Sequence, residues 1–182
     1  MKAYLDSGVF IDFLVGRSHA GPFLRSSARR GREPSQLGKD AEACLERLSL
    51  GHVILTSSLT CYEVEEAFYR ELKRSAIVAQ GDRFLIPAAR ALITQTLTII
   101  DLFGIEVVDL TSAIVTAQCQ NIELQKRGIR AADSLHVTTA VLAGADLLIT
   151  ADDDLLRLDR VFSTAGGVLR CVDSDDALSL IR

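Results

Sequence analysis

The sequence predicts an α/β protein built as a three-layer α/β/α sandwich, with a central and mainly parallel sheet. Short apolar runs with strand character alternate with longer segments of helical periodicity along nearly the whole chain. One of these runs, residues 147–149, is continuously apolar, which is typical of a central parallel strand covered on both faces. Internal repeats and low-complexity stretches are absent from the sequence. This alternation favours helices packed on both faces of a single sheet.

The N-terminal part of the sequence predicts a strand, a short helix and a long irregular segment. Residues 2–5 form the strand, and Asp6 begins the turn that closes it before an apolar helix at residues 9–14. Residues 16–39 break the pattern with glycines, prolines, serines and several arginines. A loop of this length inside a compact domain is usually either functional or mobile.

Two helices surround the second predicted strand. Residues 40–50 place their apolar side chains on one helical face, and residues 52–56 follow as a strand. Residues 59–73 then predict a longer helix with a single apolar side. On its opposite side Glu66 and Arg70 have the four-residue spacing of an ordinary solvent-facing ion pair.

A long helix, a strand and another helix follow in the next segment. Pro87 can open or kink a helix, so we place this helix at residues 88–102. The third strand is expected at residues 105–110, beyond a glycine that stops the helix. Thr111 is a suitable N-cap, and the helix that it begins runs to Arg127 before another glycine.

The C-terminal part contains a helix, a buried strand and an acidic loop in immediate succession. The helical pattern begins at Asp133 and ends at Gly144, and residues 145–150 follow as a strand with three aspartates just beyond it. Residues 168–172 supply a last strand, and a short helix runs from there to Ile181. Ligand sites of open α/β sheets gather at the carboxyl ends of the strands, so this stretch holds half of a candidate site.

Composition indicates one cytoplasmic domain spanning residues 1–182. Because 48% of its residues are hydrophobic, the chain can bury a substantial core. Its apolar runs are too short for a membrane span, and the N-terminus lacks the layout of a signal peptide. The four cysteines are widely spaced within apolar patterns, and we expect reduced core residues. A net charge of −4 argues against a nonspecific nucleic-acid coat but permits a local basic strip.

Four acidic side chains are expected at the same edge of the predicted sheet. Asp6 follows the first strand and Asp152 follows the fourth. Glu63 lies near the start of the helix after the second strand, and Asp133 begins the helix before the fourth. Converging carboxylates repel one another unless protons or a divalent cation neutralise them. Hard oxygen ligands favour Mg²⁺ or Mn²⁺, which can activate water for hydrolysis of a phosphodiester bond.

These four acids are the predicted catalytic residues, with Asp6, Asp133 and Asp152 as the metal ligands. Each has a structural alternative, since Asp6 suits a turn, Asp133 and Asp152 suit helix starts, and Glu63 completes a capping box with Thr60. Capping alone does not require the acids to cluster, so their shared edge favours function. Among the glutamates of its helix, Glu63 is chosen because it lies roughly 3 Å nearer the strand edge than the next one.

Four stretches of the sequence resemble the PIN domain nucleases, and within them the VapC-type toxins of toxin–antitoxin pairs. The stretches are YLDSGVFIDFL, LTSSLTCYEVEEAF, GIRAADSLHVTTAV and LLITADDDL. They place Asp6, Glu63, Asp133 and Asp152 at the acidic positions of the family's motifs, with Thr150 also at a matching position. The resemblance covers nearly the whole chain, and its third motif is the most specific.

This resemblance implies a PIN-like fold, an acidic site that binds Mg²⁺ or Mn²⁺, and endoribonuclease activity on RNA. It also implies a homodimer and a cognate antitoxin whose C-terminal segment fills the groove. Two features differ from the family, since Gly8 stands where an Asn is usual and the segment at 16–39 is longer. The alternative from another class is a catalytically silent PIN-like module that binds a protein partner.

Other polar residues each have two interpretations. His136, one helical turn after the third acid, is either a packed histidine bonded within the helix layer or a general base, and packing is favoured. Arg29, Arg30 and Arg32 either hold RNA phosphates or belong to a mobile solubilising loop. Arg130, like the basic pair shortly before it, either contacts phosphate or serves a helix end.

Overall fold

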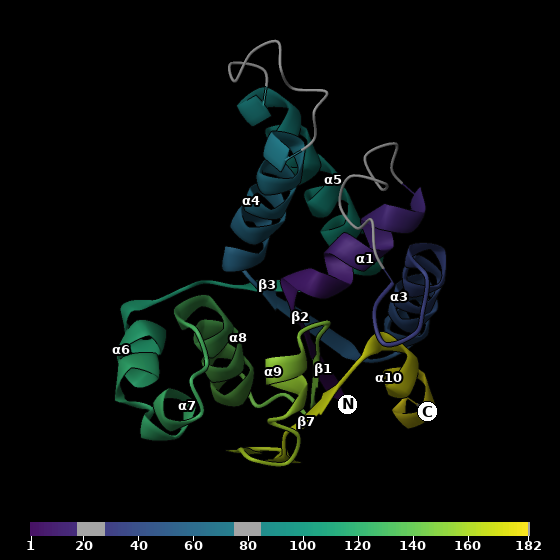
Figure 1. Ribbon diagram of the computed structural model, residues 1–182. Coiled ribbons are helices and arrows are strands. Elements are labelled where there is room, and N and C mark those ends of the chain that lie inside the picture. The colour runs from purple at the N-terminus through teal and green to yellow at the C-terminus, as the bar shows by residue number, and fades with distance from the viewer. Residues whose placement is uncertain (18–27, 75–84, 182) are drawn as a thin grey trace.

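A five-stranded parallel sheet forms the centre of the protein in a computed structural model that describes residues 1–17, 28–74 and 85–181 (Figure 1). The strand order is β3-β2-β1-β4-β7, and every neighbouring pair is parallel. The predicted α/β fold with a parallel sheet is therefore confirmed. The strands are β1 (Lys2–Leu5), β2 (Val53–Ser57), β3 (Glu106–Val108), β4 (Leu147–Ile149) and β7 (Arg170–Val172).

The order of the strands places a topological switch point beside β1. From β1 the chain builds outward through β2 to β3, and it then returns to the other side of β1 for β4 and β7. The carboxyl ends of β1 and β4 are hydrogen-bonded neighbours, with Leu5 opposite Ile149. Ligands of open α/β sheets bind at such a point.

Helices cover both faces of the sheet (Figure 1). Ala3 and Leu5 of β1 pack on one face in a core shared with α1, α3, α4, α5 and α10, whereas Tyr4 packs on the other face against α7, α8 and α9. This alternation of side chains along β1 produces the three layers. The described helices are α1 (Ser7–Arg17), α3 (Pro34–Ser49), α4 (Leu59–Arg74), α5 (Leu85–Phe103), α6 (Ser112–Gln120), α7 (Ile122–Lys126), α8 (Ala131–Leu142), α9 (Asp153–Leu156) and α10 (Ser174–Leu180).

Helix α5 is the one helix in the described part of the chain that is long and apolar enough to cross a membrane. It contains Pro87 within its first turn, so the helix begins earlier than predicted. Its buried side chains, among them Leu92 and Ile99, belong to the core on the sheet face that carries Leu5, and the helix packs against α4. One face of α5 is thus buried in the fold.

The segment predicted to be irregular at residues 16–39 is partly helical. Helix α3 begins at Pro34, six residues before the predicted start, and the extended Glu33 precedes it. Proline favours the first position of a helix because its missing N–H is not needed there. Leu37 is buried and anchors this first turn in the core. Of the rest of the segment, residues 18–27 lie outside the described residues.

Two further predictions of secondary structure are corrected by the fold. The helix expected from Thr111 to Arg127 is divided at Asn121, whose side chain accepts a hydrogen bond from the Leu124 N–H and caps α7. Thr111 itself caps α6 as predicted. The antiparallel pair β5 (Ser163–Thr164) and β6 (Gly167–Val168) was not predicted. The cysteines are free, and the one at position 119 is exposed rather than part of the core.

Arginines of the 28–33 segment make internal ion pairs. Asp173, whose side chain is 1% exposed, accepts from Arg29 at 3.0 Å and from Arg30 at 3.3 Å, and it also pairs with Arg32. A second carboxylate, Asp12 of α1, pairs with Arg29 at 2.8 Å. Neither a phosphate-binding strip nor a solubilising loop describes these arginines, because buried carboxylates hold them against the fold. We call Arg29, Arg30, Arg32 and Asp173 the arginine clamp.

The outer edge of β7 is hydrogen-bonded to the segment that precedes it. The Arg170 N–H donates to the Asp146 carbonyl on the β4 side, so the next N–H, that of Cys171, points away from the sheet. That N–H donates to Asp159 Oδ1 at 2.9 Å. The Arg160 N–H likewise donates to the Leu169 carbonyl.

Candidate metal centre

Asp6 lies at the carboxyl end of the central strand, where the chain turns into α1. Its N–H donates to the Ile149 carbonyl at 3.0 Å, which extends the β1–β4 ladder one residue beyond the strand. Its carboxylate accepts hydrogen bonds from Thr150 Oγ1 at 2.7 Å and from the Ser7 N–H at 2.8 Å. Asp6 is 5% exposed, so these bonds hold an almost buried carboxylate at the switch point.

Glu63 reaches the same edge from α4. Its Oε2 lies 2.5 Å from Nε2 of His136. The other glutamates of this helix point elsewhere, since Glu65 pairs with an arginine of α5 and Glu66 pairs with Arg70 at 2.9 Å. The predicted solvent-facing pair of Glu66 and Arg70 is thus confirmed.

The capping box predicted for Glu63 and Thr60 does not form. Thr60 lies within α4 and its hydroxyl bonds to that of Thr56 at 2.8 Å. The Leu59 N–H is instead satisfied by Ser57 Oγ at 3.1 Å. The Glu63 carboxylate is therefore not used to close the helix start.

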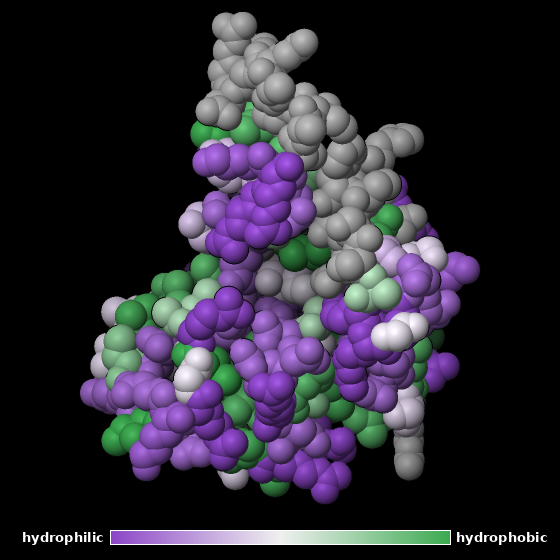
Figure 2. Space-filling model, in the orientation of Figure 1, coloured by the Kyte–Doolittle hydropathy of each residue, from purple (hydrophilic) through white to green (hydrophobic). Residues whose placement is uncertain are grey.

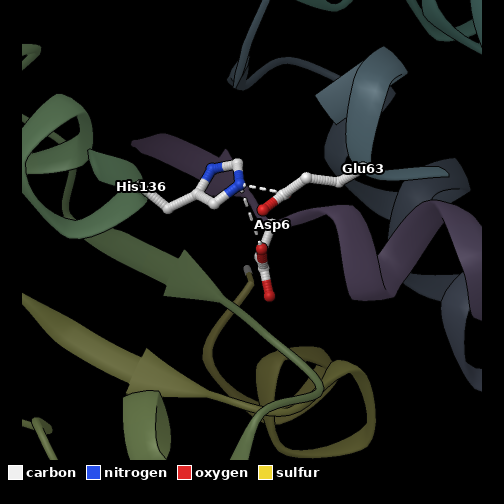
Figure 3. A group of neighbouring side chains, drawn as sticks. All are labelled: Asp6, Glu63 and His136. Atoms are coloured by element: carbon white, nitrogen blue, oxygen red, sulfur yellow. Dashed lines mark hydrogen bonds and ion pairs between the residues drawn. The ribbon is translucent and has the colours of Figure 1, made fainter. Parts of the chain in front are cut away.

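His136 is completely buried and connects three elements of the fold. Its Nε2 contacts Glu63 Oε2 and lies 3.5 Å from Asp6 Oδ1, while its Nδ1 lies 2.7 Å from the Tyr4 hydroxyl. Figure 3 shows Asp6, Glu63 and His136 pointing toward one another from β1, α4 and α8. The histidine is packed as expected, but its partners lie on or just after β1 and on α4, not in the layer of α8.

Sequence reasoning missed Tyr4 and Ser7 as partners of this cluster. Alternation along β1 places Tyr4 on the face that α8 covers, which is the one signal that the sequence offered for its contact with His136. Ser7 directly follows Asp6, and both its N–H and its hydroxyl donate to Asp6 Oδ1. Neither contact was expected.

The charges of the cluster depend on one another. Burial lowers the pKa of His136, but its hydrogen bond with Glu63 and the charge of Asp6 outweigh that effect and raise the pKa above its ordinary value. Burial opposes ionisation of Glu63, yet the hydrogen bond and charge of His136 lower the pKa of its carboxyl. Burial and the Asp6 charge raise the pKa of Tyr4, which keeps its hydroxyl protonated. Glu63 and His136 thus favour each other's charged forms.

Asp133 and Asp152 border this cluster from the two flanking helices. Arg130 occupies the N-cap of α8, so Asp133 stands inside the first turn and does not cap it. Asp152 does cap α9, because Oδ1 accepts from the N–H groups of Asp154 at 2.7 Å and Leu155 at 3.4 Å. The capping alternative is correct for Asp152, although its Oδ2 faces Arg130 at 3.6 Å.

Electrostatics show that Asp133 belongs to the acidic group. Burial, together with the charges of Asp152 and Asp6, raises the pKa of Asp133 to about 6. Its side chain remains 20% exposed, so a cation from solvent can reach it. Carboxylates close enough to perturb one another in this way gain most from a neutralising cation.

A cleft of about 380 Å³ opens beside these acids, between α4 and the start of α8. Glu63 and Asp133 contribute acidic groups to its lining, and Arg70 and Arg130 contribute basic ones. Tyr62, which is 62% exposed, also lines it. Hydrophilic side chains cover α4 and α9 on the face of the molecule shown in Figure 2.

The donor groups suit a divalent cation. Ligand atoms of Asp6, Glu63 and His136 all lie within 4.8 Å of one another. Two carboxylate oxygens and an imidazole nitrogen form a donor set that Mn²⁺ accepts, and the oxygens also suit Mg²⁺. Asp133 and Asp152 stand outside this compact group among the described residues; Asp133 lines the cleft, and Arg130 lies between it and Asp152. The residues present therefore fit a metal at the carboxyl end of β1.

The sequence profile of the PIN domain family matches residues 3–161, a span that contains all four acids. This chain belongs to the PIN domain family. PIN domains are nucleases, so the acidic edge of this PIN domain lies where a hydrolytic site is expected.

One solved structure is similar in fold over nearly the whole of the chain. A chain in the crystal structure of VapBC2 from Rickettsia felis, bound to a DNA fragment from the promoter, superposes with a TM-score of 0.51. The match covers 94% of this chain and 98% of that chain at 15% sequence identity, and it shows a shared fold. No curated protein matches the sequence.

Gly8, which replaces the asparagine usual in PIN domains, has a steric cause in this chain. A Cβ at position 8 lies 2.6 Å from the Ala151 Cβ and 3.3 Å from the Ala151 nitrogen. No side chain fits there without movement of α1 or of the loop after β4. The glycine at position 8 thus accompanies a close approach between the two segments that carry Asp6 and Asp152.

Proposed function

We propose that this PIN domain is a divalent-metal-dependent endoribonuclease that hydrolyses RNA phosphodiester bonds. The observation that carries the proposal is the convergence of Asp6, Glu63, Asp133 and Asp152, from four separate elements, at the switch point of the sheet. Structural roles explain Asp152 in part, but they leave the partly exposed Asp133 and the buried Asp6 without a reason to be neighbours. A cation site supplies that reason.

In this proposal Asp6, Asp133 and Asp152 hold Mg²⁺ or Mn²⁺, since the facing atoms of Glu63 and His136 are engaged with each other at 2.5 Å. When bound, the cation supplies Lewis acidity and lowers the pKa of water near the scissile phosphate. Thr150 and Ser7 orient Asp6 through their hydrogen bonds. His136, fixed by Tyr4, keeps Glu63 ionised, and Glu63 then accepts a hydrogen bond from water in the cleft. Hydrogen bonds that orient metal ligands in this way tune metal affinity in other proteins.

The proposal extends to a biological role as the toxin of a VapC-type toxin–antitoxin pair. The likeness to a chain of a VapBC2 complex supports an antitoxin partner, and the PIN domain match supports a nuclease. We further propose a cytoplasmic homodimer, whose mass is measured by light scattering after size-exclusion chromatography. Expression of the chain should arrest growth, and co-expression of an antitoxin from an adjacent short reading frame should restore it.

The activity is tested by incubating purified protein with a panel of structured RNAs in Mg²⁺, Mn²⁺ or EDTA. We expect cleavage with either metal, loss of cleavage in EDTA, and loss of at least about 100-fold in Asp6→Asn and Asp133→Asn. Asp101→Asn, an exposed carboxylate on α5, is the matched control and should cleave as the wild type does. Melting temperature with and without metal is measured on the same samples.

The opposite result identifies the alternative function. If wild type and variants are equally inert, and neither metal raises the melting temperature, the chain is a catalytically silent PIN-like module that binds a protein partner. Metal-induced stabilisation without cleavage of any RNA in the panel would contradict the substrate class while leaving the metal centre in place.

A further inference from the structure

Arg130 lines the cleft and lies between two of the acids. Its Nε lies 3.4 Å from Asp133 Oδ2, and its Nη2 lies 3.6 Å from Asp152 Oδ2. These separations exceed the 2.7 to 2.9 Å of a charge-assisted hydrogen bond, so the contacts are ion pairs without a fixed geometry. The side chain is 75% exposed and makes no capping bond to α8. Arg130 is therefore free to leave the carboxylates at little energetic cost.

Arg130 faces the same two carboxylates that the proposed function assigns to the metal. A guanidinium and a divalent cation repel each other when both contact the same carboxylates. Asp133 and Asp152 therefore cannot hold Arg130 and the metal at once. In the metal-free protein Arg130 neutralises part of the negative charge of the two carboxylates that it faces. Occupation of the site by metal must release it.

The released side chain stays at the cleft. Arg130, at the start of α8, and Arg70 of α4 line it together with Glu63 and Asp133. Arg70 is held by Glu66 at 2.9 Å, whereas the ion pairs of Arg130 within the described residues are with the two acids that the proposed function assigns to the metal. A planar guanidinium suits a phosphate oxygen pair better than an ammonium does.

We propose that Arg130 exchanges between these two states: it pairs with Asp133 and Asp152 in the metal-free protein, and it binds a phosphate of the RNA strand when metal is present. This inference rests on the proposed function and assigns to one residue both competition with the metal and contact with the substrate. Arg127, three residues earlier, is the matched control because it pairs with Glu123 and does not line the cleft.

The first measurement is Mn²⁺ affinity by isothermal titration calorimetry, without RNA, for wild type, Arg130→Gln, Arg130→Lys and Arg127→Gln. Removal of a competing exposed ion pair should tighten Mn²⁺ binding about three- to tenfold in Arg130→Gln. Arg130→Lys, which keeps the charge, should bind Mn²⁺ nearly as the wild type does. Arg127→Gln should show no change. Circular dichroism spectra confirm that each variant is folded.

The second measurement is binding of a fluorescein-labelled single-stranded RNA across a range of salt concentrations, in Ca²⁺ and in EDTA. A gel checks that the RNA stays intact. In Ca²⁺ we expect Arg130→Gln to weaken binding and to reduce the slope of log affinity against log salt by about 0.7, the loss of one phosphate contact. In EDTA the slopes of variant and wild type should agree, as should those of Arg127→Gln in both conditions.

Opposite effects of one substitution on metal and RNA affinity are the signature of the exchange. Unchanged Mn²⁺ affinity in Arg130→Gln, or an equal slope in Ca²⁺, overturns the role of Arg130 while metal-dependent cleavage by the wild type still supports the proposed function. If the wild type binds no Mn²⁺ at all, the metal centre and the Arg130 exchange fail together.

Discussion

Thr150 joins two of the proposed metal ligands through a single hydroxyl group. Its Oγ1 donates to Asp6 Oδ2 at 2.7 Å and accepts from the Asp152 N–H at 3.0 Å. Thr150 is completely buried, so water cannot replace either bond. The hydroxyl therefore sets the position of Asp6 relative to the loop that carries Asp152.

Replacement of this hydroxyl should weaken metal binding without altering the shape of the side chain. We expect Thr150→Val to lower Mn²⁺ affinity by about 10- to 100-fold, the usual effect of removing a group that orients a ligand. Titration calorimetry measures it. Thr98→Val removes a threonine hydroxyl that bonds only within the exposed face of α5, and it should leave the affinity unchanged. Equal Mn²⁺ affinities in both variants would show that the Thr150 hydroxyl does not orient a metal ligand.

Asp133 should make the metal-free protein less stable as the pH rises. Its pKa is about 6 in the fold against an ordinary value of 3.8, so the folded state binds this proton more tightly than the unfolded chain does. The stabilisation is complete below the unfolded pKa and is lost as the pH rises through about 6.

In EDTA we therefore expect Asp133→Asn to raise the melting temperature near pH 7.5 by roughly 2 to 5 °C and to leave it nearly unchanged near pH 4. Thermal melts across this pH range test the expectation. Asp101→Asn should shift neither value. A gain of the same size at both pH values would assign the effect to something other than ionisation of Asp133.

At this scale the sequence predicts the acids better than the groups that hold them. Asp6 follows from the end of a strand and Glu63 from helical spacing, both of which are local patterns. The contact between Glu63 and His136 joins residues 73 positions apart, and that between Tyr4 and His136 spans 132. No periodicity encodes such distances, so the roles of Tyr4 and His136 required the fold.

Among the elements, the approach of α1 to the loop after β4 is unusually close. Gly8 and Ala151 leave no room for a Cβ, and each stands two residues or fewer from a proposed ligand. The two small residues form a matched pair, since enlarging one forces the other away. The position of this loop relative to Asp6 thus depends on Gly8.

Gly8→Ala should destabilise the protein by about 1 to 3 kcal/mol, because the added methyl group overlaps the Ala151 side chain. The double variant Gly8→Ala with Ala151→Gly should recover most of that loss and of the Mn²⁺ affinity. Urea unfolding and calorimetry provide both values. Absence of recovery in the double variant would mean that the two residues are not coupled.

Element boundaries were predicted less well than element types, for identifiable reasons. Pro34 and Pro87 were treated as breaks, yet each lies in the first turn of a helix, where proline is tolerated. Asn121 divides a continuous helical pattern because its side chain caps a second helix. The segment around Arg29 is not apolar, and ion pairs with distant carboxylates hold it against the fold.

For the molecule as a whole, the arginine clamp connects the segment before α3 to the start of the C-terminal helix α10. Asp173 precedes α10 and its side chain is 1% exposed. It forms ion pairs with arginines from the segment before α3. Loss of a buried charge leaves its partners uncompensated. The clamp should therefore contribute to global stability rather than to catalysis.

Asp173→Asn keeps a capping side chain for α10 but removes the charge. We expect it to lower the free energy of unfolding by about 3 kcal/mol or more. Asp175→Asn, which pairs with Arg32 at 3.1 Å but is 42% exposed, should cost no more than about 1 kcal/mol. Urea denaturation measures the free energy of unfolding of both variants. Equal losses would contradict a stabilising role for the arginine clamp.

The fold class could be predicted because alternation of strands and helices leaves few arrangements open to a chain of this size. The continuous apolar run at β4 identified a strand covered on both faces, and the structure places it beside the central β1. The order of the strands was not predicted, since it depends on which strands pair. The switch point beside β1 therefore became visible only in the fold.

The hydrogen-bonded outer edge of β7 limits how this protein can assemble. With the Cys171 N–H bonded to Asp159 and the Leu169 carbonyl bonded to Arg160, β7 offers an incoming strand few of the backbone groups that sheet extension needs. A peptide or a second copy therefore cannot lengthen the sheet on this side by strand addition. Association at this side must instead use side-chain surfaces, which keeps β7 from becoming a template for uncontrolled polymerisation.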